Sequence, residues 1–173
     1  MSTKAMNKRL HDLMVLLRDI GALHRDLLQK VRDKADAMRQ GDVQAIQTCT
    51  RAEHNLVVRI QQREGLRRQL MDMIGKDLGL PAGQARTLSA SKLARKLDEP
   101  HRTRVTELAD QLRVCMTQLA KENRVSGTIA RGVLVHLQGI FQSIGASVSS
   151  PVGYGADGSV VSGSDQRIIE ALG

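Results

Sequence analysis

The side chains of this chain that could do chemistry are five histidines, two cysteines and a few carboxylates, and their spacing keeps them apart. The histidines are His11, His24, His54, His101 and His136. A helix presents two metal ligands on one face when they are four residues apart, and no histidine has this spacing to another histidine or to a cysteine. Cys49 and Cys115 form no C-x-x-C pair, so we interpret both as reduced thiols that pack as small apolar side chains. The sequence therefore predicts no metal site and no cofactor.

The glycine-rich and acidic stretches do not form an enzyme motif either. The chain has no P-loop, no dinucleotide-binding glycine motif, no H-E-x-x-H and no nucleophile elbow. A phosphate loop needs a preceding strand and a following helix, and the sequence predicts neither around VGYGADG, residues 152–158. Glu53, Glu64 and Asn123 lie on or beside apolar seams, where a polar residue commonly fixes helix register. We predict that the protein is not an enzyme.

The composition favours long helices over a thick globular core. Phe141 and Tyr154 are the only aromatic residues, so aliphatic side chains must supply the buried surface, and these suit a narrow seam between helices. A first helix is predicted over residues 4–40, where apolar residues recur at alternating steps of four and three. Its stripe consists of Leu10, Met14, Leu17, Gly21, His24, Leu28, Val31, Ala35 and Met38. Gly41 can end this helix and Asp42 can cap the next, which predicts an antiparallel hairpin.

The same periodicity predicts further helices over residues 42–76, 87–97 (short) and 99–145. We therefore expect an all-α body over residues 1–145, an elongated antiparallel hairpin with a third long helix in a coiled-coil-like bundle. At ~1.5 Å per residue the third helix would be roughly 65–70 Å long, longer than either partner, so part of its apolar face would overhang and lack a partner. The end of that face consists of Val133, Leu137, Phe141 and Ile144. We predict that these side chains form a groove for an amphipathic helix of another protein.

Residues 146–173 are predicted to be a flexible tail, because glycine and serine replace the helical pattern. The segment 165–172 is the exception, since its pattern predicts a short amphipathic helix. Its apolar residues are Ile168, Ile169 and Leu172. A mobile segment with a few apolar side chains and one aromatic, Tyr154, can make weak and exchangeable contacts. The pattern as a whole indicates a protein that binds other proteins.

The net charge of +8 is compatible with nucleic acid, a membrane surface or an acidic protein as the partner. On the first helix, acidic residues recur every seven positions among basic neighbours, which is typical of a solvated, salt-bridged face. These acidic residues are Asp12, Asp19, Asp26 and Asp33. The chain has no aromatic stacking platform and no long run of cations, which disfavours nucleic acid. No apolar run suits a signal peptide or a membrane span, so we expect a cytoplasmic protein without membrane insertion.

Several short features together carry a resemblance to a known family. They are the reversal at Gly41 and Asp42, the residue Glu53, the set Ile60, Glu64 and Arg68, the pair Thr87 and Leu88, the residue Asn123, and Tyr154 with Gly158. With these features the whole chain resembles the FlgN-type flagellar export chaperones, which hold the hook–filament junction proteins before secretion. The resemblance implies a chaperone that prevents premature assembly of these cargo proteins and delivers them to the export gate.

The resemblance also implies roles for individual residues. The last third of the third long helix and the segment after it would receive the helical C-terminal end of the cargo. The cargo-binding residues would be Val133, Leu137, Phe141, Ile144, Ile168, Ile169 and Leu172. Tyr154 would help dock the chaperone on the cytoplasmic ring of the flagellar export gate. From the residues alone, two other classes stay open: a basic coiled-coil protein associated with nucleic acid or the ribosome, and a structural coiled-coil subunit. Self-association is also left open.

Overall fold

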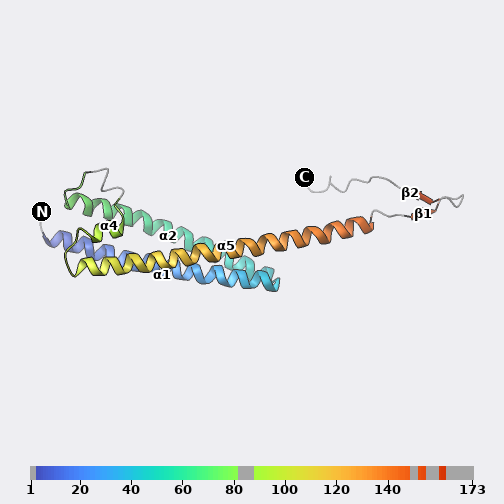
Figure 1. Ribbon diagram of the computed structural model, residues 1–173, viewed down its shortest axis with the longest axis horizontal. Helices are drawn as coiled ribbons and strands as arrows, with labels where there is room; N and C mark the ends of the chain where they lie inside the picture. Colours follow the sequence, from blue (N-terminus) through green and yellow to red (C-terminus); the bar gives the residue numbers. More distant parts are fainter. Residues whose placement is uncertain (1–2, 82–87, 149–151, 155–159, 163–173) are drawn as a thin grey trace. The chain divides into compact units, whose positions relative to one another are not determined.

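The computed structural model describes residues 3–81, 88–148, 152–154 and 160–162 (Figure 1). Within them the chain forms α1 (Thr3–Gln40), α2 (Val43–Asp77), α4 (Ala90–Ala94) and α5 (His101–Val148), followed by the short strands β1 (Val152–Tyr154) and β2 (Val160–Ser162). The chain divides into two compact units, Met1–Ala130 and Arg131–Gly173, so that α5 contributes residues to both. The predicted all-α fold, a hairpin with a third long helix, is confirmed.

The hairpin of α1 and α2 turns at the predicted pair of residues. Gly41 has a φ of +69°, a left-handed conformation that side chains disfavour, and its N–H donates to the carbonyl of Met38. Asp42 then caps α2, since its side chain accepts a hydrogen bond of 2.9 Å from the N–H of Ala45. With only these two residues between the helices, α2 must run back along α1.

The core of the first unit consists of two aliphatic clusters. The first joins all four helices and comprises Leu10, Leu13, Met14, Leu17, Met71, Ile74, Leu88, Leu93, Ala94, Leu97 and Val105. The second is thinner and comprises Leu23, Leu27, Val31 and Leu56, with Ile60 and Leu119 packed against it. The core is therefore widest around the first half of α1 and narrows to a seam further along.

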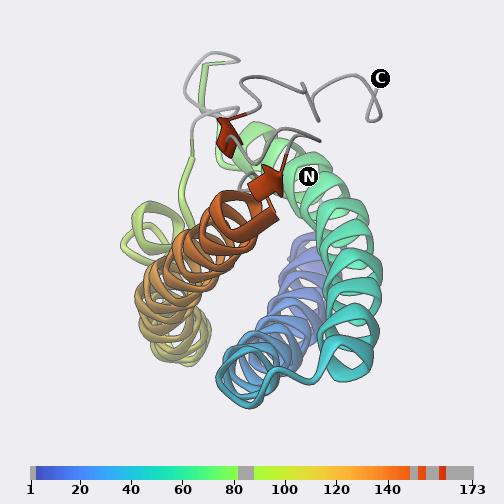
Figure 2. The same cartoon turned by 90° about the vertical axis from the view of Figure 1, so that its right-hand side faces the viewer.

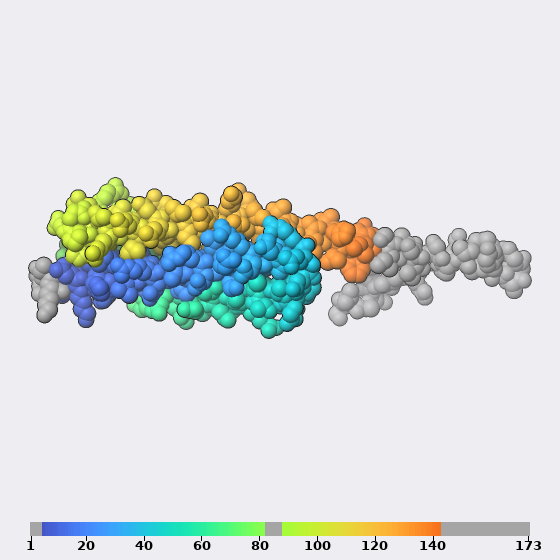
Figure 3. Space-filling view, turned by 90° about the horizontal axis from the view of Figure 1, so that it is seen from below, coloured from blue at the N-terminus to red at the C-terminus, as the bar shows by residue number. Residues whose placement is uncertain are grey.

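Helix α1 lies between α2 and the first part of α5. Figures 2 and 3 show this arrangement from the end and from below. On α5, Val105 is fully buried in the first cluster and Leu119 packs against the second. An ion pair of 3.2 Å between Arg32 on α1 and Glu122 on α5 adds a polar contact. The first part of α5 therefore joins the hairpin along a narrow line of contacts.

The segment before α5 differs in detail from its prediction. A short helix was predicted over residues 87–97, but α4 is shorter and is capped by Ser89, whose hydroxyl accepts from the N–H of Lys92 at 3.2 Å. Thr87 lies outside the described residues. At the start of α5, the carboxylate of Glu99 accepts hydrogen bonds from the hydroxyl (2.7 Å) and the N–H (3.3 Å) of Thr103. These bonds hold the pKa of Glu99 below its ordinary value.

The second unit contains a strand pair that the sequence did not predict. Strands β1 and β2 are antiparallel, with Gly153 opposite Val161 and Tyr154 opposite Val160. Valine favours extended backbone, which suits both strands. The prediction gave weight to the glycines and serines and overlooked the valines on either side.

A partly buried ion pair connects the two helices of the hairpin near its turn. Lys34 on α1 pairs with Glu53 on α2, and their side chains are only 16% and 15% exposed. The second carboxylate oxygen of Glu53 is buried without a hydrogen-bond partner among the described residues. A slip of one helix along the other would separate the pair and leave two buried charges, so this contact supports the interpretation of Glu53 as a residue that sets register.

Replacing Lys34 should therefore destabilise the hairpin more than replacing the whole pair. In Lys34→Met the carboxylate of Glu53 stays buried without its cation, and we expect the free energy of unfolding to fall by about 1–3 kcal/mol. The double variant Lys34→Met, Glu53→Leu should recover part of this loss, because no buried charge remains. Urea unfolding followed by circular dichroism measures both.

Lys30→Met is the matched control, since Lys30 forms an exposed pair with Asp33 on the same helix. Its expected cost is at most about 1 kcal/mol. If the two lysine variants lose equal stability, the Lys34–Glu53 pair does not have this structural role.

Candidate protein-binding surfaces

The described part of the predicted cargo-binding set lies on one exposed face of α5. Val133, Leu137 and Phe141 follow one another at steps of four, which places them along one side of the helix. They are 41%, 42% and 70% exposed. Ile144 lies at the position that continues this face, and its side chain is outside the described residues. We call these four residues the C-terminal stripe.

The structure does not describe the side chains of the other predicted site residues. Tyr154 is the last residue of β1, and only its backbone is described. Ile168, Ile169 and Leu172 lie outside the described residues. Their assignment to cargo binding and gate docking therefore stays a prediction.

A second surface, which the sequence reasoning missed, lies in the first unit. A groove of about 940 Å³ is bordered by α2 on one side and α5 on the other, with residues of α1 and of the segment at the start of α4 completing its lining. We call it the basic trough. Its lining residues are Leu17, His24, Glu64, Arg67, Arg68, Leu88, Ser89, Ala90, Ser91, Ala109, Leu112, Arg113, Met116, Thr117 and Ala120.

Two of the three arginines that line the basic trough form ion pairs, and the third does not. Arg67 pairs with Glu64 at 2.9 Å on the same helix. Arg113 pairs with Asp110 at 3.1 Å and donates to the hydroxyl of Ser91 at 3.2 Å. Arg68 is exposed and has no ion-pair partner among the described residues. The trough therefore has more positive than negative charge at its edges.

The one histidine of the trough is held by the backbone. His24 is buried, and its Nδ1 lies 2.9 Å from the carbonyl oxygen of Ile20, one turn earlier in α1. A ring nitrogen within this distance of a carbonyl is expected to carry the proton, so Nδ1 is assigned as the donor. The ring therefore acts as part of the packed wall of the trough.

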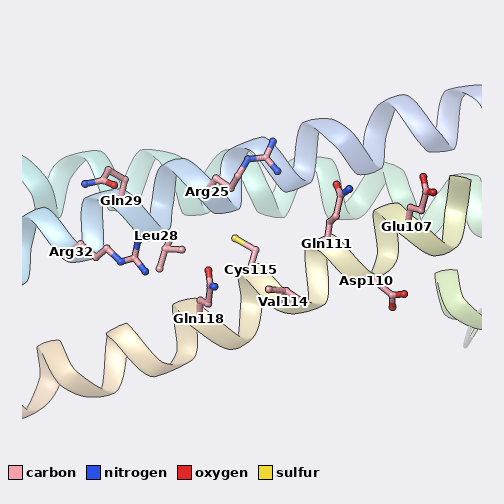
Figure 4. Close-up of a pocket in the computed structure, with 10 residues that line it drawn as sticks. All are labelled: Arg25, Leu28, Gln29, Arg32, Glu107, Asp110, Gln111, Val114, Cys115 and Gln118. Carbon is pink, nitrogen blue, oxygen red and sulfur yellow. The ribbon is translucent and has the colours of Figure 1, made fainter.

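On the other side of the α1–α5 contact there is a smaller groove, of about 780 Å³ (Figure 4). It is lined by Arg25, Leu28, Gln29 and Arg32 from α1 and by Glu107, Asp110, Gln111, Val114, Cys115 and Gln118 from α5. Two arginines and two carboxylates line this groove, so its charges are balanced. Burial raises the pKa of the Cys115 thiol, against the opposing effect of the nearby arginines Arg25 and Arg32. Cys49 and Cys115 are both free and buried.

The described residues contain no group of three or more His, Cys, Asp or Glu side chains placed to hold a metal ion. None of their helices is long and apolar enough to cross a membrane.

The fold and these surfaces define an all-helical protein that exposes apolar side chains on its long helices. The model of the FlgN protein family matches residues 6–162, and the chain therefore belongs to the FlgN family. This is a family of flagellar export chaperones. Three of the residues that carried the resemblance, Glu64, Arg68 and Leu88, line the basic trough together. Neither the curated proteins nor the solved structures contain a match to this chain.

The protonated state of Cys115 can be tested by its reactivity. In a Cys49→Ala variant, where Cys115 is the only thiol, alkylation by iodoacetamide should be slower than in the urea-unfolded chain at the same pH. Because burial raises its pKa, the rate should continue to increase at pH values where the rate of a free thiol has already levelled off. Mass spectrometry of samples quenched at intervals gives the rate. Fast alkylation of the folded protein at neutral pH would instead show that the arginines stabilise the thiolate.

Proposed function

We propose that this FlgN-family protein acts in the cytoplasm as the chaperone of hook–filament junction proteins. It binds their helical C-terminal ends, prevents their premature assembly and delivers them to the flagellar export gate. The observation that supports this proposal is the described part of the C-terminal stripe, since Val133, Leu137 and Phe141 are exposed along one face of α5. In this proposal the protein is a binding protein and not an enzyme, and its partners are other proteins.

The stripe has the spacing that a helical partner would use. Apolar side chains at steps of four form the contact row of one helix, and an amphipathic helix of a partner can lay its own apolar row against it. Phe141, with 70% of its surface exposed, offers the largest apolar area to bury. We therefore assign Phe141 as the main anchor, with Val133, Leu137 and Ile144 beside it.

The tail has a separate role in this proposal. Ile168, Ile169 and Leu172 add apolar contacts that help retain the cargo. Tyr154 docks on the cytoplasmic ring of the export gate, since a single aromatic can fill a partner's pocket while its hydroxyl makes one hydrogen bond. Separate residues for cargo and gate would allow both partners to be bound at the moment of handover.

The distribution of ion pairs supports a protein partner over nucleic acid. Basic residues on three helices are engaged by carboxylates, including Arg9 with Asp77, Lys34 with Glu53 and Arg32 with Glu122. Cations that are neutralised within the fold contribute little to phosphate binding. The net charge of +8 already counts these carboxylates, and what disfavours nucleic acid is that the paired cations are not free to contact phosphate.

Phe141→Ala should weaken cargo binding by about 1–3 kcal/mol, the cost of removing an aromatic anchor from an interface. The melting temperature should change little, because the side chain is mostly exposed in the free protein. Isothermal titration with a peptide from the C-terminal end of a junction protein measures the affinity. Circular dichroism measures the melting temperature.

Val135→Ala is the matched control. Val135 is also an exposed apolar residue of α5, but at 100° per residue it lies on the opposite side of the helix from the stripe. Its replacement should leave the affinity unchanged. Equal losses in the two variants, or none in Phe141→Ala, would remove the stripe from the cargo site.

Tyr154→Ala should separate gate docking from cargo binding. We expect unchanged helicity and cargo affinity but weaker binding to the purified cytoplasmic ring of the export gate, and hence less secretion of the junction proteins. Tyr154→Phe keeps the ring and removes the hydroxyl, so it should retain most of the binding if ring burial dominates. If Tyr154→Ala binds the gate ring as well as the parent protein does, the docking role must be abandoned.

A further inference from the structure

We propose that the basic trough of the first unit is a second docking surface, which binds one amphipathic helix with acidic side chains along its flanks. This goes beyond the proposed cargo and gate roles. The trough shares no residue with the C-terminal stripe or with the tail. It can therefore succeed or fail as a binding site independently of them.

The arrangement of the helices favours a helix as the occupant. Residues of α2 and α5 line the two sides, and Leu17 and His24 of α1 lie between them. Adding a helix there would complete the packing of a four-helix bundle, in which each helix contacts two neighbours. The α5 side extends from Ala109 to Ala120, about 16 Å at ~1.5 Å per residue, so it matches a partner segment of about three turns.

The lining of the trough can accept an apolar helix face. Met116 is 51% exposed and Leu112 is half-buried, so both have apolar surface left to cover. They are one turn apart on α5 and face the trough with the small residues Ala109 and Ala120. Small residues beside larger ones allow a partner helix to approach closely and place its own side chains between them. The apolar row of the occupant would pack here.

The charges decide which helix fits. Three arginines line the trough: Arg67 and Arg113 each pair with a carboxylate of their own helix, and Arg68 is exposed without an ion-pair partner among the described residues. Acidic side chains on the flanks of the occupant would complement these arginines, whereas basic flanks would be repelled. A second copy of the chain that presented the same surface would bring two sets of arginines together. The trough therefore favours an acidic helix from a different protein.

The test uses the full-length protein and two labelled synthetic peptides. Both are helices of four turns with the same leucine row; one has glutamate on its flanks and the other has lysine. Fluorescence anisotropy at moderate salt should show binding of the glutamate peptide and at least tenfold weaker binding of the lysine peptide. Equal affinities for the two peptides would overturn the proposal.

Variants of the protein locate the binding. Arg68→Glu should weaken binding of the glutamate peptide at least fivefold, and Met116→Ser should weaken it as well. Both residues are exposed, so neither change should unfold the protein. Arg51→Glu is the matched control, because Arg51 is an exposed arginine of α2 outside the trough. If Arg51→Glu has the same effect as Arg68→Glu, the peptide responds to overall charge and the proposal is wrong.

Two further outcomes would assign the trough differently. Loss of glutamate-peptide binding in Phe141→Ala would place the peptide on the C-terminal stripe and overturn the trough as its site. A dimer of the parent protein that becomes monomeric in Arg68→Glu, measured by sedimentation, would assign the trough to a second copy. Failure of cargo binding in Phe141→Ala with normal peptide binding supports both sites, since the two measurements are independent.

Discussion

The structure of the first unit depends on the burial of one helix, α1, by aliphatic side chains alone. Its residues Leu13, Ile20 and Val31 are almost completely buried, and both core clusters are built around it. Neither cluster contains an aromatic side chain. The first cluster joins all four described helices, whereas the second is thinner. The two grooves lie on either side of the contact between α1 and the first part of α5.

Because the aliphatic seam between the helices is thin, polar contacts are also needed to set the register in which the helices pair. Helices that meet through similar aliphatic side chains could pair in several registers at similar energy. Gly41 and Asp42 fix where the hairpin turns, and the buried pair of Lys34 and Glu53 penalises a slip near that turn. At the other end of the hairpin, Arg9 on α1 pairs with Asp77 on α2. The two ion pairs between α1 and α2 lie near opposite ends of the hairpin. They therefore fix the register of the two helices, which the aliphatic side chains alone would leave open.

Much of this fold could be predicted from local pattern, and the limits of the prediction have physical reasons. The two hairpin helices and α5 follow from a period of three to four residues, and the turn follows from Gly41 and Asp42. The exposed row of Val133, Leu137 and Phe141 was also found, because periodicity defines the face of a single helix. The basic trough was missed, since its lining depends on how three helices pack together, which periodicity does not specify. The exact start of α4 and the strand pair were missed, because several nearby residues could cap a short helix and a few valines among glycines and serines give no strand periodicity.

The C-terminal stripe is too small to hold the cargo by itself, so cargo binding needs further contacts. Fully burying a Val, Leu or Phe side chain contributes about 1.5–3 kcal/mol, and Val133 and Leu137 are already more than half covered in the free protein. The described stripe can therefore supply only a few kcal/mol. Ordering a disordered partner segment costs about 2–5 kcal/mol, which would consume most of that gain. Under the proposed function, stable retention then needs contacts beyond Val133, Leu137 and Phe141, and the apolar residues of the tail are the candidates. Because no single contact set would be sufficient, loss of one set, as when the tail engages the gate, would leave the cargo weakly held and ready for release.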